Sequence, residues 1–200
     1  MQGNVLAQPI PEEFTTKHPL QHTWTWWFDS PRRRTSQASW ANNLKQIYSF
    51  STVEDFWCLW NNIKGAHELP PGSNYHVFKE GIEPMWEHPA NRTGGKWIVQ
   101  VKNSQRESLL NQFWLFSVLG CIGASFDDDD EICGLVISLR KSADKICLWT
   151  RTANDAEKCK RIGRQFRDML GVSSRLQYQL HHDAMQQDSS FTNKSKYDLS

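Results

Sequence analysis

The sequence lacks every short motif by which common nucleotide-handling enzymes are identified. It contains no GxxxxGK[ST] loop, no GxGxxG after an apolar strand, no HExxH and no GxSxG. The adjacent pair Glu87 and His88 has no second positioned partner, so it is a poor acid/base candidate. We therefore predict that the chain is not an enzyme and has no catalytic residues.

The sequence also lacks an excess of either charge and a long apolar run. Its 23 Lys and Arg balance 22 Asp and Glu, and the net charge of +1 excludes a long basic track for nucleic acid. The most apolar run, FWLFSVLGCIG, is shorter than the roughly 20 residues that span a membrane. Any nucleic-acid contact should be a small local site, and no membrane contact is expected.

Paired cysteines are absent as well. The five cysteines form no CxxC pair and no Cys/His cluster with zinc spacing, so we expect small core residues, no metal and no cofactor. The N-terminus has no charged-then-apolar leader, which favours a reducing cytoplasmic or nuclear compartment. Residues 1–17 should be a flexible N-terminal tail, and residues 18–200 a single folded domain.

Tryptophan, in contrast, is abundant, with ten residues. Most should lie in a core, but two are placed on loops: Trp40 in DSPRRRTSQASW and Trp86 in KEGIEPMWEHPANRTGGKW. Trp86 directly precedes Glu87, and an ionised carboxylate can only accept hydrogen bonds. The pair therefore suits a flat ligand that stacks and also donates.

Hydrophobic periodicity predicts an α+β fold. Helix starts are expected at the capping patterns Ser51-x-x-Glu54 and Thr152-x-x-Asp155, and a helix stop at Gly171. A further helix is expected over 105–126. These helices interrupt runs of strands, which indicates a sheet with helices on one face. The expected strands cover 24–28, 44–50, 75–80, 96–102, 132–140, 145–151, 175–180 and 196–199.

Two of the expected helices carry a second apolar face. Val53 and Trp57 lie one turn apart and off the core face of the first helix, and Leu115 and Leu119 do so in the second. A helix that is apolar on two faces needs two coverings, so we expect a partner to cover the second face.

Two charge clusters have competing interpretations. The run Asp127–Glu131 could hold a hard cation, but it lacks the spaced ligands and central Gly of a calcium loop, which favours a solvated turn. Arg140 and Lys145 bracket the turn of an expected hairpin, where they serve either solubility or anion binding. Arg140 and Lys145 would combine with four other candidates into a site for a base that carries phosphates and is preferably cationic. The four are Trp40, Trp86, Glu87 and Lys96.

Six segments resemble the eukaryotic translation initiation factor 4E family, which binds the 7-methylguanosine cap of mRNA. They are HPLQHTWTWWF, TVEDFW, FKEGIEPMWE, GGKW, ICGLVISLR and DKICLWTR, colinear from about His18 to the C-terminus. In having Trp at both stacking positions, the chain resembles the main cap-binding class of this family. The resemblance implies a single curved antiparallel β-sheet with three helices packed on its convex face and the cap slot on its concave side.

The resemblance also implies a role for each site residue. Trp40 and Trp86 would sandwich the methylated base, Glu87 would accept from its N1 and N2 donors, and Trp149 would sit by the N7-methyl group. Lys96, Arg140 and Lys145 would hold the phosphates. Factor 4G or 4E-binding proteins would dock a Tyr-x4-Leu-apolar helix on the convex side. That surface would comprise His18, Pro19, Leu20, Val53, Trp57, Leu115 and Leu119.

Four positions depart from many relatives. Lys96 stands where Arg is common, which turns a forked phosphate contact into a point charge. Ser142 replaces a basic residue, Phe116 replaces a Glu on the partner surface, and Phe191 falls about where animal members carry a regulatory phosphoserine. Cap affinity, partner preference and phosphoregulation are therefore open.

We thus expect a non-enzymatic cap-binding protein that recruits capped mRNA through a 4G-type scaffold and is a monomer outside that complex. A translational repressor that docks a different partner is the alternative within the binding class. A cap hydrolase that uses Glu87, His88 and the acidic run with a metal is the alternative from another class. Carbohydrate binding by the Trp residues is a third.

Overall fold

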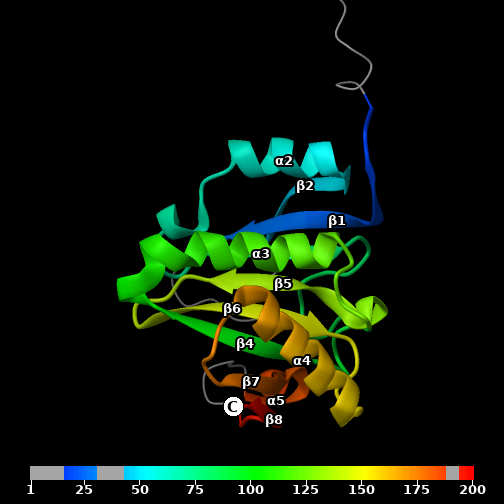
Figure 1. Ribbon diagram of the computed structural model, residues 1–200, viewed down its shortest axis with the longest axis vertical. Coiled ribbons are helices and arrows are strands. Elements are labelled where there is room, and N and C mark those ends of the chain that lie inside the picture. The colour runs from blue at the N-terminus through cyan, green and yellow to red at the C-terminus, as the bar shows by residue number, and fades with distance from the viewer. Residues whose placement is uncertain (1–15, 31–42, 188–193) are drawn as a thin grey trace, which may run out of the picture.

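An antiparallel sheet of eight strands organises the described residues, 16–30, 43–187 and 194–200, of the computed structural model (Figure 1). The strand order is β2-β1-β3-β5-β6-β4-β7-β8. Each strand overlaps one expected from the sequence, and the single antiparallel sheet is confirmed. The strands are β1 (Pro19–Asp29), β2 (Lys45–Thr52), β3 (Asn74–Lys79), β4 (Gly95–Lys102), β5 (Ile132–Ser138), β6 (Ala143–Thr150), β7 (Leu176–Leu180) and β8 (Tyr197–Leu199).

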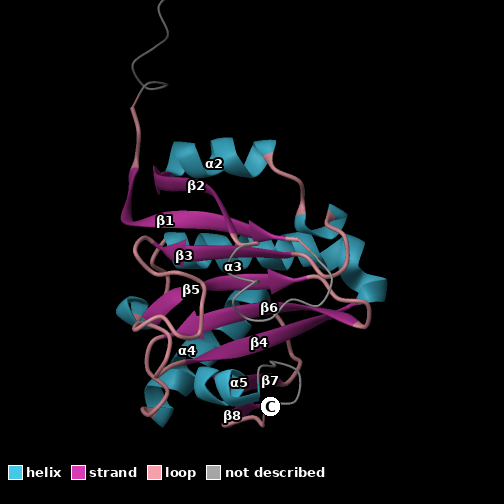
Figure 2. Ribbon diagram, turned by 180° about the vertical axis from the view of Figure 1, so that it is seen from behind, coloured by secondary structure: helices cyan, strands magenta, loops and turns pink. Residues whose placement is uncertain are grey.

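Helices α2 (Val53–Asn62), α3 (Asn111–Ile122) and α4 (Ala156–Leu170) lie on one face of the curved sheet (Figure 1), which confirms the expected α+β layering. A short helix that the sequence did not predict, α5 (His181–Gln187), lies on the opposite face (Figure 2). Single turns of 3-10 or π helix cover Ala66–Glu68, Asn103–Gln105, Arg106–Leu110 and Asp129–Glu131. Among the described helices, none has the length and apolar character needed to cross a membrane.

Three expectations fall outside the described residues. They concern the N-terminal tail up to residue 15, the loop tryptophan Trp40, and the C-terminal Ser/Thr cluster around Phe191.

The main core lies between the sheet and the three long helices. Trp26 on β1 contacts Trp60, Tyr75 and Trp114 edge-on, with ring centroids 6.1, 5.4 and 5.7 Å apart. Aromatic pairs of this geometry add roughly 0.5–1.5 kcal/mol each beyond their buried area. Because side chains alternate along a strand, filling this face leaves every second residue for the opposite, concave face.

Four of the five cysteines are buried, as expected of core residues, but Cys58 on α2 is exposed. Burial raises the pKa of the Cys133 thiol to about 12, because the thiolate is poorly solvated there. These buried thiols are therefore protonated packing groups.

Both expected helix starts were wrong by one to three residues. Thr52, not Ser51, caps α2 by accepting from the Asp55 amide at 3.2 Å. Glu54 binds His18 instead of closing a capping box. Asp155, not Thr152, caps α4 by accepting from the Lys158 amide at 3.0 Å. The stop at Gly171 is confirmed, since this residue takes the left-handed conformation with a φ of 63°.

The acidic run is solvated only in part, which corrects the expectation for Asp127–Glu131: Asp127 and Asp130 are exposed, but Asp129 is buried. Asp129 is 9% exposed and accepts from Lys79 Nζ at 2.8 Å and from His22 Nε2 at 2.8 Å. Asp128 and Glu131 form ion pairs with α4, to Arg161 and Lys158. His22, Asp129 and Asp130 lie close enough to share a cation, but the Lys79 ammonium already supplies positive charge there. The run therefore attaches the turn to β3 and α4.

Lys79→Met should lower the free energy of unfolding by roughly 3 kcal/mol, because it leaves the buried Asp129 carboxylate without its cation. Urea denaturation measures this, with the exposed Lys102→Met as the matched control. Lys79→Met with Asp129→Asn should recover part of the loss. A change within about 0.5 kcal/mol in the single variant would show that the pair is not a structural element.

Candidate functional site

A slot opens on the concave face, across β3, β5, β6 and β4. The register of the sheet places His76, Val136, Cys147 and Ile98 side by side in one row across these strands. The next row holds Asn74, Ser138 and Lys145. The floor is thus largely apolar, with polar and basic groups at one end. The full lining is Asn74, His76, Pro84, Met85, Trp86, Lys96, Ile98, Val136, Ser138, Arg140, Lys145, Cys147 and Trp149.

The loop between β3 and β4 forms one wall and carries Trp86, which is half-buried. Asn91 is fully buried and fixes the loop, because its side-chain amide donates to the carbonyls of Glu83 at 2.9 Å and Met85 at 2.8 Å. His88 Nδ1 accepts from the Ala90 amide at 3.2 Å, so this histidine closes a local turn. Trp86 therefore sits on a pinned loop rather than on a free one.

Trp149 lines the slot beside its cross-strand partner Lys96 and is 5% exposed. Its ring packs edge-on against Phe78 at 5.4 Å, and the ring of His181 from α5 lies 4.0 Å away. His181 is fully buried, and desolvation holds its pKa well below the usual value, so the ring is neutral. Sequence reasoning missed His181, because no spacing separated it from the other histidines.

Three cations line the slot. Lys96 on β4 pairs across the sheet with Trp149 on β6, while Lys145 lies in the row of Asn74 and Ser138. Lys96 is 5% exposed and has no hydrogen bond or ion pair among the described residues. Desolvation lowers its pKa, and Lys145 and Arg140 add to this effect by repulsion. The described lining includes no Asp or Glu. A buried cation without a counter-charge raises the free energy of the fold, so the slot is suited to an anion.

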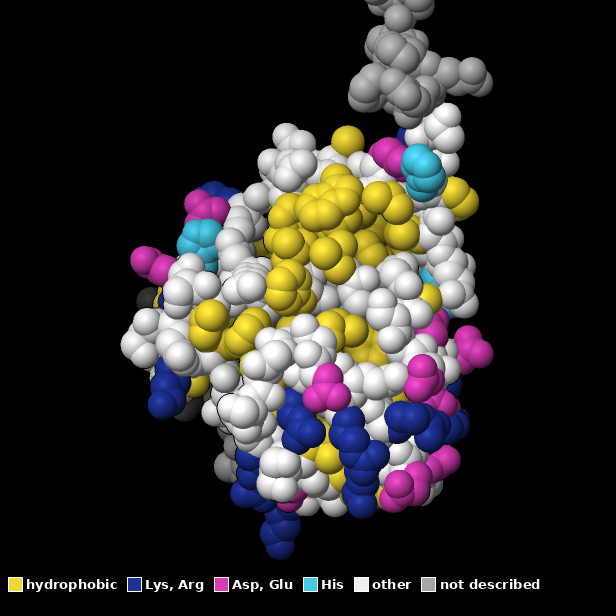
Figure 3. Space-filling view, viewed as in Figure 1, with side chains coloured by type: hydrophobic (Ala, Val, Ile, Leu, Met, Phe, Trp, Pro, Cys, Tyr) yellow, Lys and Arg dark blue, Asp and Glu magenta, His cyan; other side chains and the backbone are white. Residues whose placement is uncertain are grey.

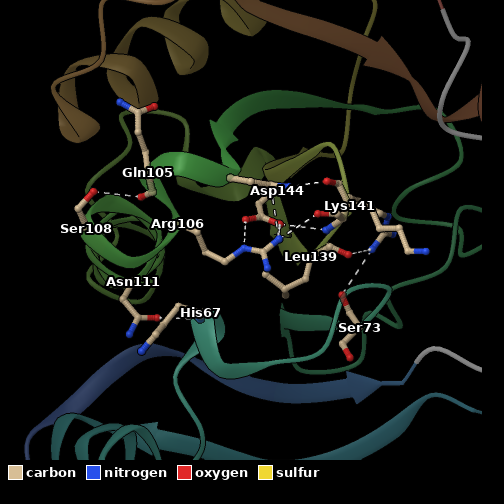
Figure 4. Close-up of polar contacts among 11 residues, drawn as sticks. His67, Ser73, Gln105, Arg106, Ser108, Asn111, Leu139, Lys141 and Asp144 are labelled. Carbon is tan, nitrogen blue, oxygen red and sulfur yellow. Dashed lines mark hydrogen bonds and ion pairs between the residues drawn. The ribbon is translucent and has the colours of Figure 1, made fainter.

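Arg140 is held at its backbone by a buried ion pair (Figure 4). Asp144, which is fully buried, accepts from Arg106 Nε at 2.6 Å and Nη2 at 2.7 Å and from the Arg140 amide at 2.9 Å. Arg106 Nη2 also donates to the Arg140 carbonyl at 2.9 Å. The turn between β5 and β6 is therefore attached to the segment that leads into α3.

The helical side of the sheet presents a separate apolar surface (Figure 3). Val53, Trp57 and Phe116 are each 37% exposed, and Leu115 and Leu119 are half-buried. The start of β1 borders α2 through His18, whose amide and ring nitrogens contact Glu54 at 2.9 and 2.6 Å. These bonds lower the pKa of Glu54 to about 2. We call this the dorsal patch, and it comprises Leu20, Val53, Trp57, Leu115, Phe116 and Leu119 with His18 and Pro19 at its border.

The structure brings five of the expected ligand residues to one slot, namely Trp86, Trp149, Lys96, Arg140 and Lys145. Glu87 is exposed beside Trp86 and is not among the described residues that line the slot. Trp40 lies outside the described residues.

Comparison with known proteins identifies relatives over most of the chain. A sequence model described as "Eukaryotic initiation factor 4E" matches residues 19–196. Eukaryotic translation initiation factor 4E of Dictyostelium discoideum is 44% identical over 167 residues, which cover 84% of this chain and 66% of that protein. Allele A of the Solanum tuberosum factor is 41% identical over 193 residues, which cover 96% of this chain and 82% of that protein.

Solved structures of the same family share the fold. C. elegans eIF4E-3, in a complex with the 4E-binding protein Mextli, has a TM-score of 0.83 and 38% identity, covering 92% of this chain and 100% of that one. Ascaris suum eIF4E-3 with the m7G cap has a TM-score of 0.83 and 36% identity, covering 92% of this chain and 98% of that one.

Lys96→Met should raise the stability of the ligand-free protein by roughly 1 kcal/mol or more while weakening the binding of inorganic triphosphate, because it removes an unpaired buried cation. Urea denaturation and a triphosphate titration measure the two effects. The matched control is Lys102→Met, which changes an exposed lysine on the same strand. Weaker binding without any gain in stability would contradict the desolvation argument.

The same argument predicts a pH dependence. Desolvation lowers the pKa of folded Lys96 below that of the unfolded residue, which is near 10.4. Between these values the unfolded chain binds the extra proton, so stability should rise with pH there. Lys96→Met should lack this rise, and an identical rise in both proteins would assign it to another group.

Proposed function

The chain belongs to the eukaryotic initiation factor 4E family, and on that premise we propose that it binds the 7-methylguanosine cap of mRNA and recruits the mRNA through a scaffold partner. The observation that carries the proposal is the lining of the slot. The rings of Trp86 and Trp149 suit a cationic base, while Lys96, Arg140 and Lys145 in the same slot suit its phosphates. Relatives in complexes with cap or with a 4E-binding protein support both halves of the proposal.

For the base, Trp86 supplies one stacking face and Trp40 the other. A desolvated cation over Trp gains about 2 kcal/mol, so two such faces favour a methylated, positively charged guanine over plain guanine. Glu87 accepts from the guanine N1 and N2 donors, and Trp149 lies beside the methyl group. Glu87 is exposed and directly follows Trp86, so the proposal places its carboxylate at the edge of a base stacked on that ring.

On the helical side, the dorsal patch receives the apolar face of a Tyr-x4-Leu-apolar helix from a 4G-type scaffold or a 4E-binding protein. The slot residues of β3, β5 and β6 alternate with residues packed in the core under the helices, so the slot and the dorsal patch lie on opposite faces of the sheet and leave room for cap and partner together. We place the protein in the cytoplasm or nucleus, where capped mRNA is found.

A translational repressor is the second candidate, and the exposed Phe116 ring favours it. An apolar ring on the dorsal patch suits a partner with an apolar rather than a basic residue opposite. A hydrolase is disfavoured by the family, whose members here are named as initiation factors. We expect no product when 7-methyl-GTP is incubated with magnesium and the protein.

Tryptophan fluorescence should be quenched by 7-methyl-GTP at concentrations roughly 10-fold or more below those needed for GTP, because a positively charged base stacks more strongly on Trp than a neutral one. Trp86→Leu should weaken 7-methyl-GTP binding by roughly 5-fold to 100-fold, the range of one base–aromatic stack. Equal affinity for the two nucleotides would overturn cap recognition.

Trp57→Ala should weaken binding of a Tyr-x4-Leu-apolar peptide by roughly 30-fold or more, the scale of an exposed aromatic hot spot, and leave 7-methyl-GTP affinity unchanged. Trp86→Leu should do the reverse, so each variant controls for the other. Calorimetry with both ligands measures this. Loss of both ligands in either variant would indicate misfolding, and peptide binding that survives Trp57→Ala would exclude the dorsal patch.

A further inference from the structure

A buried carboxylate lies beside the slot, next to the row of Asn74, Ser138 and Lys145. Asp29 is the last residue of β1, is 4% exposed, and pairs across the sheet with Asn74 on β3. Asn74 Nδ2 donates to both of its oxygens, at 3.0 Å to Oδ1 and 2.8 Å to Oδ2. His76 Nε2 lies 2.6 Å from Oδ1. An ionised carboxylate only accepts, so His76 donates this bond, and Asp29 fixes two residues of the slot from the neighbouring strand.

Asn74 links Asp29 to Arg140 by hydrogen bonds on its two sides. With its amide nitrogen committed to Asp29, the Asn74 side chain presents its oxygen to the slot, where it accepts from Arg140 Nη2 at 3.0 Å. The same guanidinium donates from Nη1 to the Leu139 carbonyl at 2.8 Å. A rotated Asn74 amide would lose the bonds on both sides at once. The orientation of the guanidinium therefore depends on a carboxylate that does not touch it.

Asp29 also supplies negative charge that the slot lining lacks. The described lining holds three cationic side chains and no acid, and burial lowers the pKa of Arg140 while the charge of Asp29 opposes that effect. Asp144 acts on the Arg140 backbone, but it lies on the side of Arg106. Asp29 is thus the buried acid on the side of the guanidinium.

We propose that Asp29 is a positioning residue for anion binding: through Asn74 it holds the Arg140 guanidinium in the orientation that meets the phosphate chain of the ligand. The inference rests on the proposed function, because it assigns the phosphates to the cations of the slot. We therefore expect that replacing Asp29 weakens ligand binding more, the more phosphates the ligand carries, and that it has little effect on binding of the base alone. A residue that only stabilised the fold would weaken every ligand alike.

The test compares three variants by fluorescence titration with 7-methylguanosine, 7-methyl-GTP, GTP and inorganic triphosphate. Asp29→Asn should weaken 7-methyl-GTP and inorganic triphosphate by roughly 10-fold, the scale of one hydrogen-bonded contact, and change 7-methylguanosine by less than about 2-fold. Asp127→Asn, which neutralises an exposed acid, should change none of them.

The double variant Asp29→Asn with Asn74→Asp separates positioning from folding. It exchanges the two side chains, so the new carboxylate on β3 would accept from Arg140 directly. The new amide at the end of β1 would donate to that carboxylate and accept from His76. Triphosphate affinity should return to within about 3-fold of the wild type. An equal loss for 7-methylguanosine and 7-methyl-GTP in Asp29→Asn, or no recovery in a folded double variant, would overturn the inference.

The two proposals fail in different ways. Equal wild-type affinity for 7-methyl-GTP and GTP would overturn cap recognition, while the Asp29 effect on either triphosphate would still stand. Normal cap discrimination with no effect of Asp29→Asn would overturn only the role of Asp29. A wild type that binds no triphosphate would overturn both.

Discussion

The slot on the concave face is lined by three cationic side chains, and its described lining contains no Asp or Glu. The rest of the concave face depends on this constraint. Lys96 is 5% exposed without a partner among the described residues, and Arg140 and Lys145 line the same slot. Such a cluster is unfavourable in the ligand-free fold, because each cation loses hydration and repels the others. The compensation lies outside the lining, in Asp29 on the neighbouring strand and Asp144 behind the turn. The aromatic core on the opposite face provides the stability that offsets this cost.

The slot and the dorsal patch are built on opposite faces of one sheet. The alternation of side chains gives β3, β5 and β6 one row for the core and one for the slot, so neither surface disturbs the packing of the other. Arg106, which precedes α3, holds both Asp144 and the Arg140 carbonyl, so the turn that carries Arg140 is attached to the helical side of the sheet.

Local sequence patterns predicted the strands and long helices well, because the hydrophobic periodicity of a strand or an amphipathic helix depends on residues that are close in the sequence. Val53 and Trp57 were separated from the core face of α2 by spacing alone, and both are exposed. Two of the errors lie where a side chain pairs with a residue far away in the sequence. Glu54 left its capping box for His18, 36 residues away, and Asp129 found Lys79, 50 residues away. The pair of Asp29 and Asn74 spans 45 residues, and only strand pairing reveals it.

The neutral state of His181 limits the positive charge around Trp149. A protonated histidine behind Trp149 would repel both Lys96 and a cationic base. Complete burial keeps the ring neutral, and the nearby charge of Lys96 acts in the same direction. The slot therefore combines polarisable rings with three cations and no further charge from this histidine. A ligand with a cationic ring and an anionic tail matches both the rings and the cations, whereas a nucleotide with a neutral base matches only the cations.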